Sequence, residues 1–560
     1  MMETASDVAG ERTAAGGTRH GVVFVHGVGA QRKSDTLLDF GEPLLAWVVD
    51  WYAARGAASP RAGAVTLGFA PVDTGEADAL SRAKVCLPNG DEWVWTEAWW
   101  ATSNRRPDFG TMIVWSLGYL WRIILQLVRA TQQRIRRLHG QPGSTDPAPW
   151  ARVVDLMNCF ALLVLYPLGA LAGYAVLLPL LLLAQVPLPA FQDFVLLRLI
   201  RPFLVVNVGE FRTYIVSDLQ AANMHRRVDE AVRWLAEEAH CADVTIIAHS
   251  EGAVVSFGML SDPAHATAAG HVRKLITLGA GLNKSWLVEP DLGRLYGPLP
   301  PHVYWLDVWA SYDPVPAGWL QPPHLASGER APIYQPSEAV QKLHNVMPQH
   351  AESPYPGLAA LRADAPTAVY WPTSEQVTNE MNVVSDHGGY FANAEQVLVR
   401  LAAEIDAPRH TDSPFWRGDQ VLAEGEARTP ALTDAVRARR ERVSLLALWR
   451  GLVVAVGGVS AVLAAETVAG VLRRTGLARL VGDWLSWLRD VAALLPALGG
   501  LIDGLVAMAY WLLGAVVVAV PFVVLYLAGR ALVWDRLDRQ ARADGIARIA
   551  TAGRRPGAAP

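Results

Sequence analysis

The sequence predicts an α/β protein that also carries membrane-spanning helices. Two short apolar runs, residues 21–25 and 244–248, each end in a glycine-containing turn, a pattern typical of buried strands in a largely parallel sheet. Apolar residues between 209 and 240 fall partly at helical spacing, so a helix is expected before the second strand. The composition is apolar for a soluble protein, since 52% of the residues are hydrophobic and 18% are charged.

The second apolar run ends in a sharp turn at Ser250. The turn reads A-H-S-E-G, a variant of the G-x-S-x-G nucleophile elbow in which Ala248 replaces the first glycine and Gly252 supplies the second small residue. An elbow exposes the serine hydroxyl at the tip of a strand and points the next backbone N–H into the site. A five-residue motif also occurs by chance, and an ordinary strand-turn-helix is the alternative. Partner residues for serine chemistry decide between the two.

The loop after the first strand is the candidate oxyanion site. It reads His26-Gly27-Val28-Gly29, and its two glycines permit a close approach to a ligand. The backbone N–H groups of Val28 and Glu251 are the expected donors to the oxyanion. A phosphate-binding loop is the alternative, but the third glycine of a dinucleotide fingerprint is missing and no G-K-[ST] follows.

Asp313 is the candidate for the carboxylate that orients the base. Residues 302–310 are expected to form a strand, and Asp313 lies in the S-Y-D-P-V loop that leaves its end. An ordinary Asp-Pro turn is the alternative. Asp307 is a second choice for the acid, although it lies within the expected strand.

His387 is the candidate general base. It follows both Ser250 and Asp313 in the chain and lies in a D-H-G-G-Y loop, whose glycines give the imidazole room to reach the serine. His249 and His26 adjoin the other two motifs. We expect them to orient the backbone and neighbouring groups rather than to act as the base.

Taken in order, the segments HGVG, AHSEG, SYDPV and DHGGY resemble the oxyanion loop, elbow, acid loop and histidine loop of α/β-hydrolases of the lipase and esterase type. The resemblance covers residues 20–110 and 209–408. It implies an α/β-hydrolase sheet, a Ser250–His387–Asp313 triad, and ester hydrolysis or acyl transfer without a cofactor. Because little chain precedes the first strand, the first two strands of a full hydrolase sheet are expected to be missing.

Long apolar blocks lie outside this resemblance. Residues 160–184 and 504–529 contain no charged residue, and each is long enough to cross a hydrocarbon layer of about 30 Å. An interfacial or core helix is the alternative for three weaker segments that carry charges, residues 112–128, 191–208 and 445–465. The oxyanion loop precedes these blocks and the triad follows the first of them. The chain is therefore expected to cross the membrane an even number of times between residues 110 and 209.

Charge patterning predicts the orientation. Arginines flank the C-terminal apolar region on both sides, within residues 437–442 and 530–542, which favours a cytoplasmic location for both flanks. The first twenty residues are polar and contain no signal-peptide core. We expect an integral protein of a bacterial plasma membrane whose catalytic domain faces the cytoplasm.

The sequence gives no indication of a cofactor or a metal. Three widely spaced cysteines favour neither a disulfide framework nor a zinc site, and the histidines form no cluster with ligand spacing. The formal net charge of −4 argues against a general nucleic-acid binder. Trp93, Trp95, Trp99 and Trp100 are candidates to line an acyl site or the bilayer surface, with ordinary core packing as the alternative.

The leading hypothesis is a membrane-embedded serine hydrolase that cleaves a carboxylic ester of a lipid or another apolar acyl compound through an acyl-enzyme. Its partners are then the ester and the bilayer, and the oligomeric state stays open. Two alternatives remain: an acyltransferase with the same triad, and a catalytically inert interaction or signalling module on a hydrolase fold. The expected organisation is a disordered tail (1–19), a first part of the hydrolase domain (20–110), a hydrophobic membrane insertion (111–208), the second part of the hydrolase domain (209–408), a polar and basic linker (409–442), a C-terminal transmembrane region (443–532) and a basic cytoplasmic tail (533–560).

Overall fold

The chain forms two compact units, which are described separately. The first contains Met1–Asp146, Asn158–Arg440 and Arg542–Pro560, and the second contains Pro147–Met157 and Glu441–Ala541. The computed structural model describes residues 17–29, 31–66, 80–101, 149–165, 209–288, 299–300, 302–320, 372–383, 385–417, 430–474 and 499–551, with single positions between 115 and 131 and at 167.

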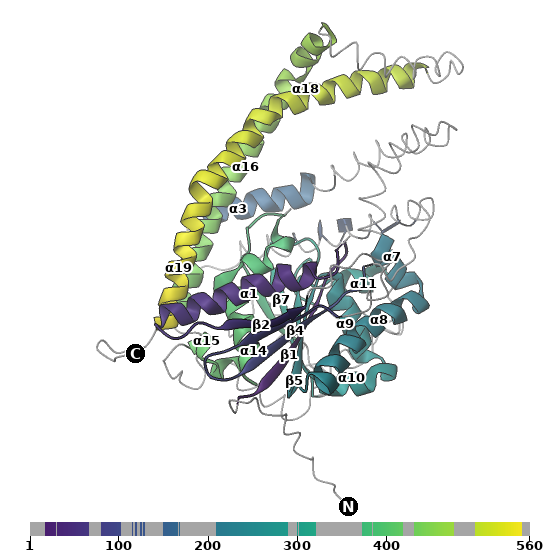
Figure 1. Cartoon of the computed structure of the whole chain (residues 1–560). Coiled ribbons are helices and arrows are strands. Elements are labelled where there is room, and N and C mark those ends of the chain that lie inside the picture. The colour runs from purple at the N-terminus through teal and green to yellow at the C-terminus, as the bar shows by residue number, and fades with distance from the viewer. Residues whose placement is uncertain are drawn as a thin grey trace, which may run out of the picture. The chain divides into compact units, whose positions relative to one another are not determined.

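The first unit is built on one eight-stranded mixed sheet (Figure 1). The strand order across the sheet is β2-β3-β4-β1-β5-β6-β7-β8. The six strands from β4 to β8 in this order run parallel, whereas β3 is antiparallel to β4 and β2 is antiparallel to β3. The strands are β1 (Arg19–Val25), β2 (Arg61–Thr66), β3 (Arg82–Cys86), β4 (Glu92–Ala98), β5 (Asp243–His249), β6 (Val272–Leu278), β7 (Tyr304–Ala310) and β8 (Thr373–Val377).

The central strands are continuous apolar runs because both of their faces are covered. The last five residues of β1 and all seven residues of β7 are buried. The parallel register aligns Val25 of β1 with Ala248 of β5, and Ala248 with Thr277 of β6. The carboxyl ends of these strands therefore meet at one edge of the sheet, and the loops that follow them lie together.

Helices cover both faces of the sheet (Figure 1). Side chains of α8 (Asp218–Arg233) and α9 (Glu251–Ser261) pack into one apolar cluster. Side chains of α1 (Asp35–Ala54) and α14 (Val399–Asp406) pack into a second cluster on the other face. This arrangement confirms the predicted α/β class.

The helix expected between residues 209 and 240 forms in three pieces. α7 (Gly209–Val216) is followed by α8 and by a π-helical turn at Trp234–Glu238. The break between the first two pieces is at Ser217, whose backbone is extended. The three pieces together lead into β5, as the apolar spacing predicted.

The tryptophans of β4 belong to the core. Trp93 and Trp95 are buried, and Trp95 packs edge-on against Phe24. Trp100 is also buried, and its ring is stacked on that of His26. For these three side chains the structure supports the ordinary core interpretation, and none of them lies at an exposed surface.

Strands β2 and β3 form one edge of the sheet. β1 is the first strand of the described chain. β2 and β3, which follow β1 in the sequence, form an antiparallel hairpin beside β4. No described strand precedes β1, and with this hairpin the described sheet has eight strands.

The second unit contains most of α16 (Pro430–Arg474) and the whole of α18 (Gly499–Gly529). The two helices approach closely at small residues: a Cβ added at Gly514 would lie 3.1 Å from the backbone N of Ala469. The guanidinium of Arg450 donates to the Tyr526 hydroxyl across the pair at 3.1 Å. Close backbone approach at small residues is typical of helix pairs in membranes.

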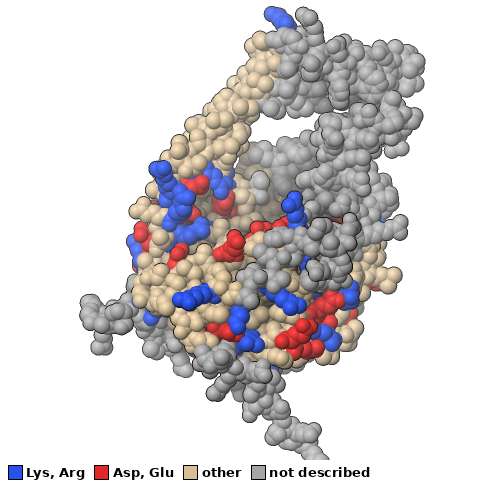
Figure 2. Space-filling view, viewed as in Figure 1, with Lys and Arg blue, Asp and Glu red and all other residues tan. Residues whose placement is uncertain are grey.

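Two described segments are long and apolar enough to cross a membrane, Leu432–Leu472 and Val517–Ala550. Many of their large apolar side chains face outward, including Val454 and Leu463, which are 68% and 76% exposed. In Figure 2 the described surface of α16 and α18 is largely uncharged, and charged side chains gather toward α19 (Asp535–Thr551).

These two helices contain the C-terminal segments that the sequence singled out. Residues 445–465 lie within α16 and residues 504–529 within α18. Of the three N-terminal apolar segments, 191–208 lies outside the described residues, and 112–128 and 160–184 lie largely outside them.

The segments interpreted as a C-terminal linker and tail contain helices. The linker expected at 409–442 contains α15 (Pro414–Arg417) and the first part of α16. In place of a plain basic tail, residues 535–551 form α19, and the side chains of Ile546 and Ile549 are buried in the apolar cluster of α1 and α14. The last turns of the chain therefore belong to the first unit.

A buried ion cluster joins β6, β8 and α14. The ammonium of Lys274 donates to the Glu404 carboxylate at 2.8 Å and to the Ala407 carbonyl at 2.6 Å. Arg400 forms ion pairs with Glu404 at 2.9 Å and with Glu375 at 3.1 Å. Against the effect of burial, these two cations hold the pKa of Glu404 down at about 2. Glu404 therefore stays ionised over the physiological pH range.

We predict that Glu404→Gln lowers the free energy of unfolding of the first unit by about 3–5 kcal/mol, because Lys274 and Arg400 keep buried charges without their shared partner. Since the folded-state pKa of Glu404 is depressed, its contribution is complete above pH 4.5 and is lost between pH 4.5 and about 2. Urea unfolding measures the change, and Glu230→Gln, in an exposed helix pair, is the control. Equal stabilities of the two variants would contradict the prediction.

Candidate active site

Ser250 occupies a strained turn between β5 and α9. Its backbone has φ 58° and ψ −120°, a conformation that costs a residue other than glycine about 1–3 kcal/mol. Neighbouring backbones approach the turn closely, since a Cβ added at Gly252 would lie 2.6 Å from the Val25 carbonyl oxygen. A Cβ at Gly27 would lie 2.5 Å from the Ser250 Cβ. A small residue is therefore required at Gly252, as the motif predicted, and at Gly27 in the neighbouring loop. Ala248 is accommodated inside β5.

The three residues selected as nucleophile, base and acid lie in one hydrogen-bonded chain. His387 Nε2 is 2.9 Å from Ser250 Oγ. His387 Nδ1 is 2.9 Å from Asp313 Oδ2 and 3.0 Å from Oδ1. The Asp313 side chain is fully buried, whereas that of His387 is 25% exposed. The serine can pass its proton to the imidazole, and the carboxylate can stabilise the resulting cation.

Asp313 is fixed in place by two further donors. It accepts hydrogen bonds from the Tyr390 hydroxyl at 2.7 Å and from the Val315 backbone N–H at 2.8 Å. Asp307, the second choice for the acid, lies elsewhere in the core and accepts from Thr277 Oγ1 at 2.7 Å. Burial raises the pKa of Asp307 to about 7. The geometry therefore selects Asp313 over Asp307 as the partner of His387.

His249 and His26 both contact the backbone around the site. His249 Nε2 donates to the His387 carbonyl at 2.9 Å, and burial lowers the pKa of His249 to about 3. His26 Nδ1 is 2.7 Å from the Gly27 carbonyl, and His26 Nε2 accepts from the Trp100 N–H at 3.2 Å. Burial lowers the pKa of His26 to about 4. Both rings are therefore neutral near pH 7 and hold neighbouring backbone in position.

The predicted oxyanion loop lies directly beside the serine turn. Gly27 lies against Ser250, and Val28 is the next residue of the loop. Glu251 is the first residue of α9, and a helix leaves its first backbone N–H groups without an intrahelical acceptor. The Gly29 N–H is already engaged, because it donates to Glu210 Oε2 at 3.0 Å. Val28 and Glu251 thus remain the candidate donors to an oxyanion.

Asp386 connects the acid loop to the histidine loop. Its Oδ2 accepts from the Tyr312 N–H at 3.0 Å, and its Oδ1 accepts from the Glu380 and Asn382 N–H groups at 2.8 and 3.3 Å. Burial raises the pKa of Asp386 to about 7 while these donors oppose the rise. The sequence pattern did not predict that Asp386 links the two loops or that Tyr390 holds Asp313. Both residues stand in the D-H-G-G-Y segment, so the motif itself was the available signal.

The side chain of Glu251 is an unexpected feature of the site. It is 1% exposed, and neither carboxyl oxygen has a hydrogen-bond partner among the residues that the structure describes. Burial, with a smaller contribution from the nearby Glu210 carboxylate, raises the pKa of Glu251 well above its usual range. The raised pKa favours the uncharged form of this carboxyl, which does not oppose negative charge on a substrate oxygen. Sequence reasoning used only the backbone N–H of this residue.

We predict that Gly252→Ala lowers the free energy of unfolding by about 1–3 kcal/mol, because the new Cβ forces α9 away from the end of β1. Gly270→Ala is the matched control, since nothing lies within 4 Å of a Cβ at that helical position. Urea unfolding compares the two variants. If Gly252→Ala were as stable as the control, the close approach of α9 to β1 would be wrong.

Comparison with known proteins identifies no relative: no family model, curated protein or solved structure matches the chain. Any functional assignment therefore depends on the chemistry of the residues just described.

Proposed function

We propose that this protein is a membrane-associated serine hydrolase of the α/β-hydrolase superfamily, of the lipase and esterase type, and that it cleaves a carboxylic ester of a lipid or another apolar acyl compound. The observation that carries the proposal is the hydrogen-bonded chain Ser250–His387–Asp313 at a strained strand-to-helix turn. A serine, an imidazole and a buried carboxylate in this arrangement are the parts that acyl transfer needs.

Ester cleavage would proceed in two steps. Ser250 Oγ attacks the ester carbonyl as its proton moves to His387 Nε2, and the N–H groups of Val28 and Glu251 stabilise the oxyanion. Asp313 stabilises the imidazolium. The C–O bond to the alcohol breaks, and the alcohol leaves with the proton from His387. Water, deprotonated by His387, then attacks the acyl-serine, releases the carboxylic acid and restores the Ser250 hydroxyl.

The order of the elements supports the hydrolase assignment. The nucleophile follows β5, the acid follows β7, which is the second strand beyond the elbow, and the base follows β8. This is the chain order of a hydrolase triad, Ser then Asp then His. Burial also raises the pKa of Glu251, which favours its uncharged form, and a carboxylate there would repel the developing oxyanion.

The apolar helices support a lipid-like substrate and a membrane location. α16 and α18 expose apolar side chains along segments long enough to cross a bilayer. Residues 430–440 and 542–560, which flank this helical pair, belong to the same compact unit. Two crossings would leave both flanks on one side. The arginines within them favour the cytoplasmic side.

The first test is covalent labelling of the detergent-solubilised full chain with a fluorophosphonate. We predict labelling at Ser250 in the wild type, its complete loss in Ser250→Ala, and a fall in labelling rate by about four to six orders of magnitude in His387→Ala. Mass spectrometry of the labelled peptide locates the modification. Ser261→Ala, at the opposite end of α9, is the control and keeps full labelling.

Two outcomes would contradict the hydrolase proposal. A folded wild-type protein that does not react favours the inert interaction module. Labelling that is independent of His387 means that the imidazole does not activate the serine. Where labelling succeeds, product analysis with a long-chain ester in the presence of an alcohol distinguishes free acid from transferred acyl ester.

We predict that Leu463→Lys lowers the fraction of protein that resists alkaline extraction from membranes. A lysine at the centre of a spanning helix costs about 2.5–3.5 kcal/mol, and Leu463 is 76% exposed within α16. Leu219→Lys is the control because Leu219 is 86% exposed on α8, outside the apolar helices. Equal extraction of the two variants would argue that α16 does not enter the bilayer.

A further inference from the structure

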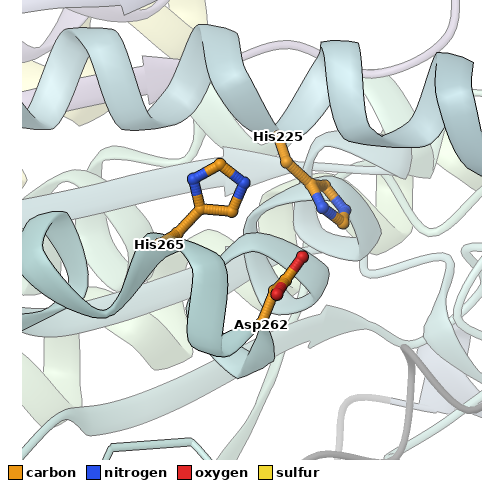
Figure 3. Close-up of side chains that lie close together, drawn as sticks. All are labelled: His225, Asp262 and His265. Atoms are coloured by element: carbon orange, nitrogen blue, oxygen red, sulfur yellow. The ribbon is translucent and has the colours of Figure 1, made fainter.

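A second cluster of chemically competent side chains lies at the far end of the nucleophile helix. His225 projects from α8, Asp262 directly follows α9, and His265 ends the short helix at Pro263–His265. One potential ligand atom from each residue lies within 4.8 Å of the other two, and Figure 3 shows the three side chains converging. His225 and His265 are far apart in the sequence, so their spacing does not match that of a metal-binding motif.

Tyr214 determines which nitrogen of His225 faces the cluster. The tyrosine hydroxyl donates to the Val254 carbonyl at 3.3 Å and lies 3.0 Å from His225 Nε2. A hydroxyl has one proton, so when it is directed at Val254 the tyrosine oxygen accepts from the His225 Nε2–H. His225 Nδ1 therefore carries the lone pair. Gly258 makes this arrangement possible, because a Cβ there would lie 2.5 Å from His225 Nε2.

Asp229 sets the tautomer of His265 in the same manner. Its Oδ1 is 3.0 Å from His265 Nδ1, and its Oδ2 accepts from Arg233 Nε at 2.8 Å. The carboxylate favours a proton on Nδ1, which leaves the lone pair on His265 Nε2. In Figure 3 one ring nitrogen of His265 is turned toward His225 and the other away from it. A carboxylate behind a histidine is the usual outer partner of a metal-binding imidazole.

Asp262 supplies the negative charge. Its Oδ1 accepts from the Ala264 N–H at 2.9 Å, which caps the short helix. The carboxylate keeps a second oxygen for another partner, and in Figure 3 it is directed at His225. Two imidazole nitrogens and one carboxylate oxygen are a ligand set that suits divalent transition metals and does not suit Mg²⁺ or Ca²⁺.

We propose that His225, Asp262 and His265 bind one Zn²⁺ ion as a structural clamp between α8 and the end of α9. Zinc takes nitrogen and oxygen ligands at about 2.0–2.2 Å, so the three atoms close by up to about 1 Å on binding and water completes a tetrahedron. The 11-residue α9 separates this cluster from Ser250 by about 16 Å. The ion therefore holds the nucleophile helix in place and takes no part in ester chemistry, so the proposal is independent of the hydrolase assignment.

The test uses the full chain in detergent after removal of metals with a chelator. We expect one zinc per chain by elemental mass spectrometry after gel filtration. Thermal unfolding should shift upward by about 5 °C in the presence of excess Zn²⁺. Mg²⁺ and Ca²⁺ at the same concentration should leave the unfolding temperature unchanged.

Variants assign the binding to this cluster. Asp262→Asn keeps the acceptor for the Ala264 N–H, so the metal-free protein should unfold at the wild-type temperature. We expect Asp262→Asn and His265→Gln to lose the bound zinc and its stabilisation. Asp229→Asn should weaken affinity by about 10–100-fold, because it removes only the outer partner. His271→Gln, at an exposed histidine, should bind as the wild type does.

The proposal is overturned if the wild type holds no stoichiometric zinc and shows no thermal shift. It is also overturned if Asp262→Asn and His265→Gln retain wild-type zinc binding, since the ion would then occupy other histidines. If one of the four variants fails to fold, the metal contents of the other three still test the proposal, because each variant is measured independently.

Discussion

The first unit depends on one constraint, which is the left-handed backbone at Ser250. The serine can hold φ 58° only because β5 ends there and α9 begins at the next residue, with the backbone of β1 packed against both. Gly27 and Gly252 are small for this reason. The same turn leaves the first N–H of α9 without an intrahelical acceptor and presents the hydroxyl to the loops that follow β7 and β8. Strain at one residue thus produces the geometry of the whole site.

Loops from separate strands contribute to the site because the sheet is parallel in this region. Asp386 and Tyr390 bind the acid loop to the histidine loop, and His249 binds the histidine loop to the turn. Together these contacts fix an imidazole that is itself partly open to solvent. A base that is held by its surroundings and still reachable is what a serine nucleophile requires.

The sequence predicted those parts of the fold and site that short-range patterns encode. Apolar runs marked β5 and β7, and chain order combined with glycine-rich turns selected Asp313 and His387. β8 has the sequence T-S-E-Q-V, and no apolar run marked it. The buried state of Glu251, the ion cluster around Glu404 and the His225 cluster arise from tertiary contacts between distant segments. Residue type alone does not reveal which polar side chains such contacts enclose.

The return of α19 to the core has a consequence for biosynthesis. Ile546 and Ile549 belong to the same apolar cluster as residues of α1 near the start of the chain. A ribosome releases these two isoleucines only after both apolar helices have emerged. The cluster therefore reaches its final packing only after both apolar helices have been synthesised, although its N-terminal members are made first.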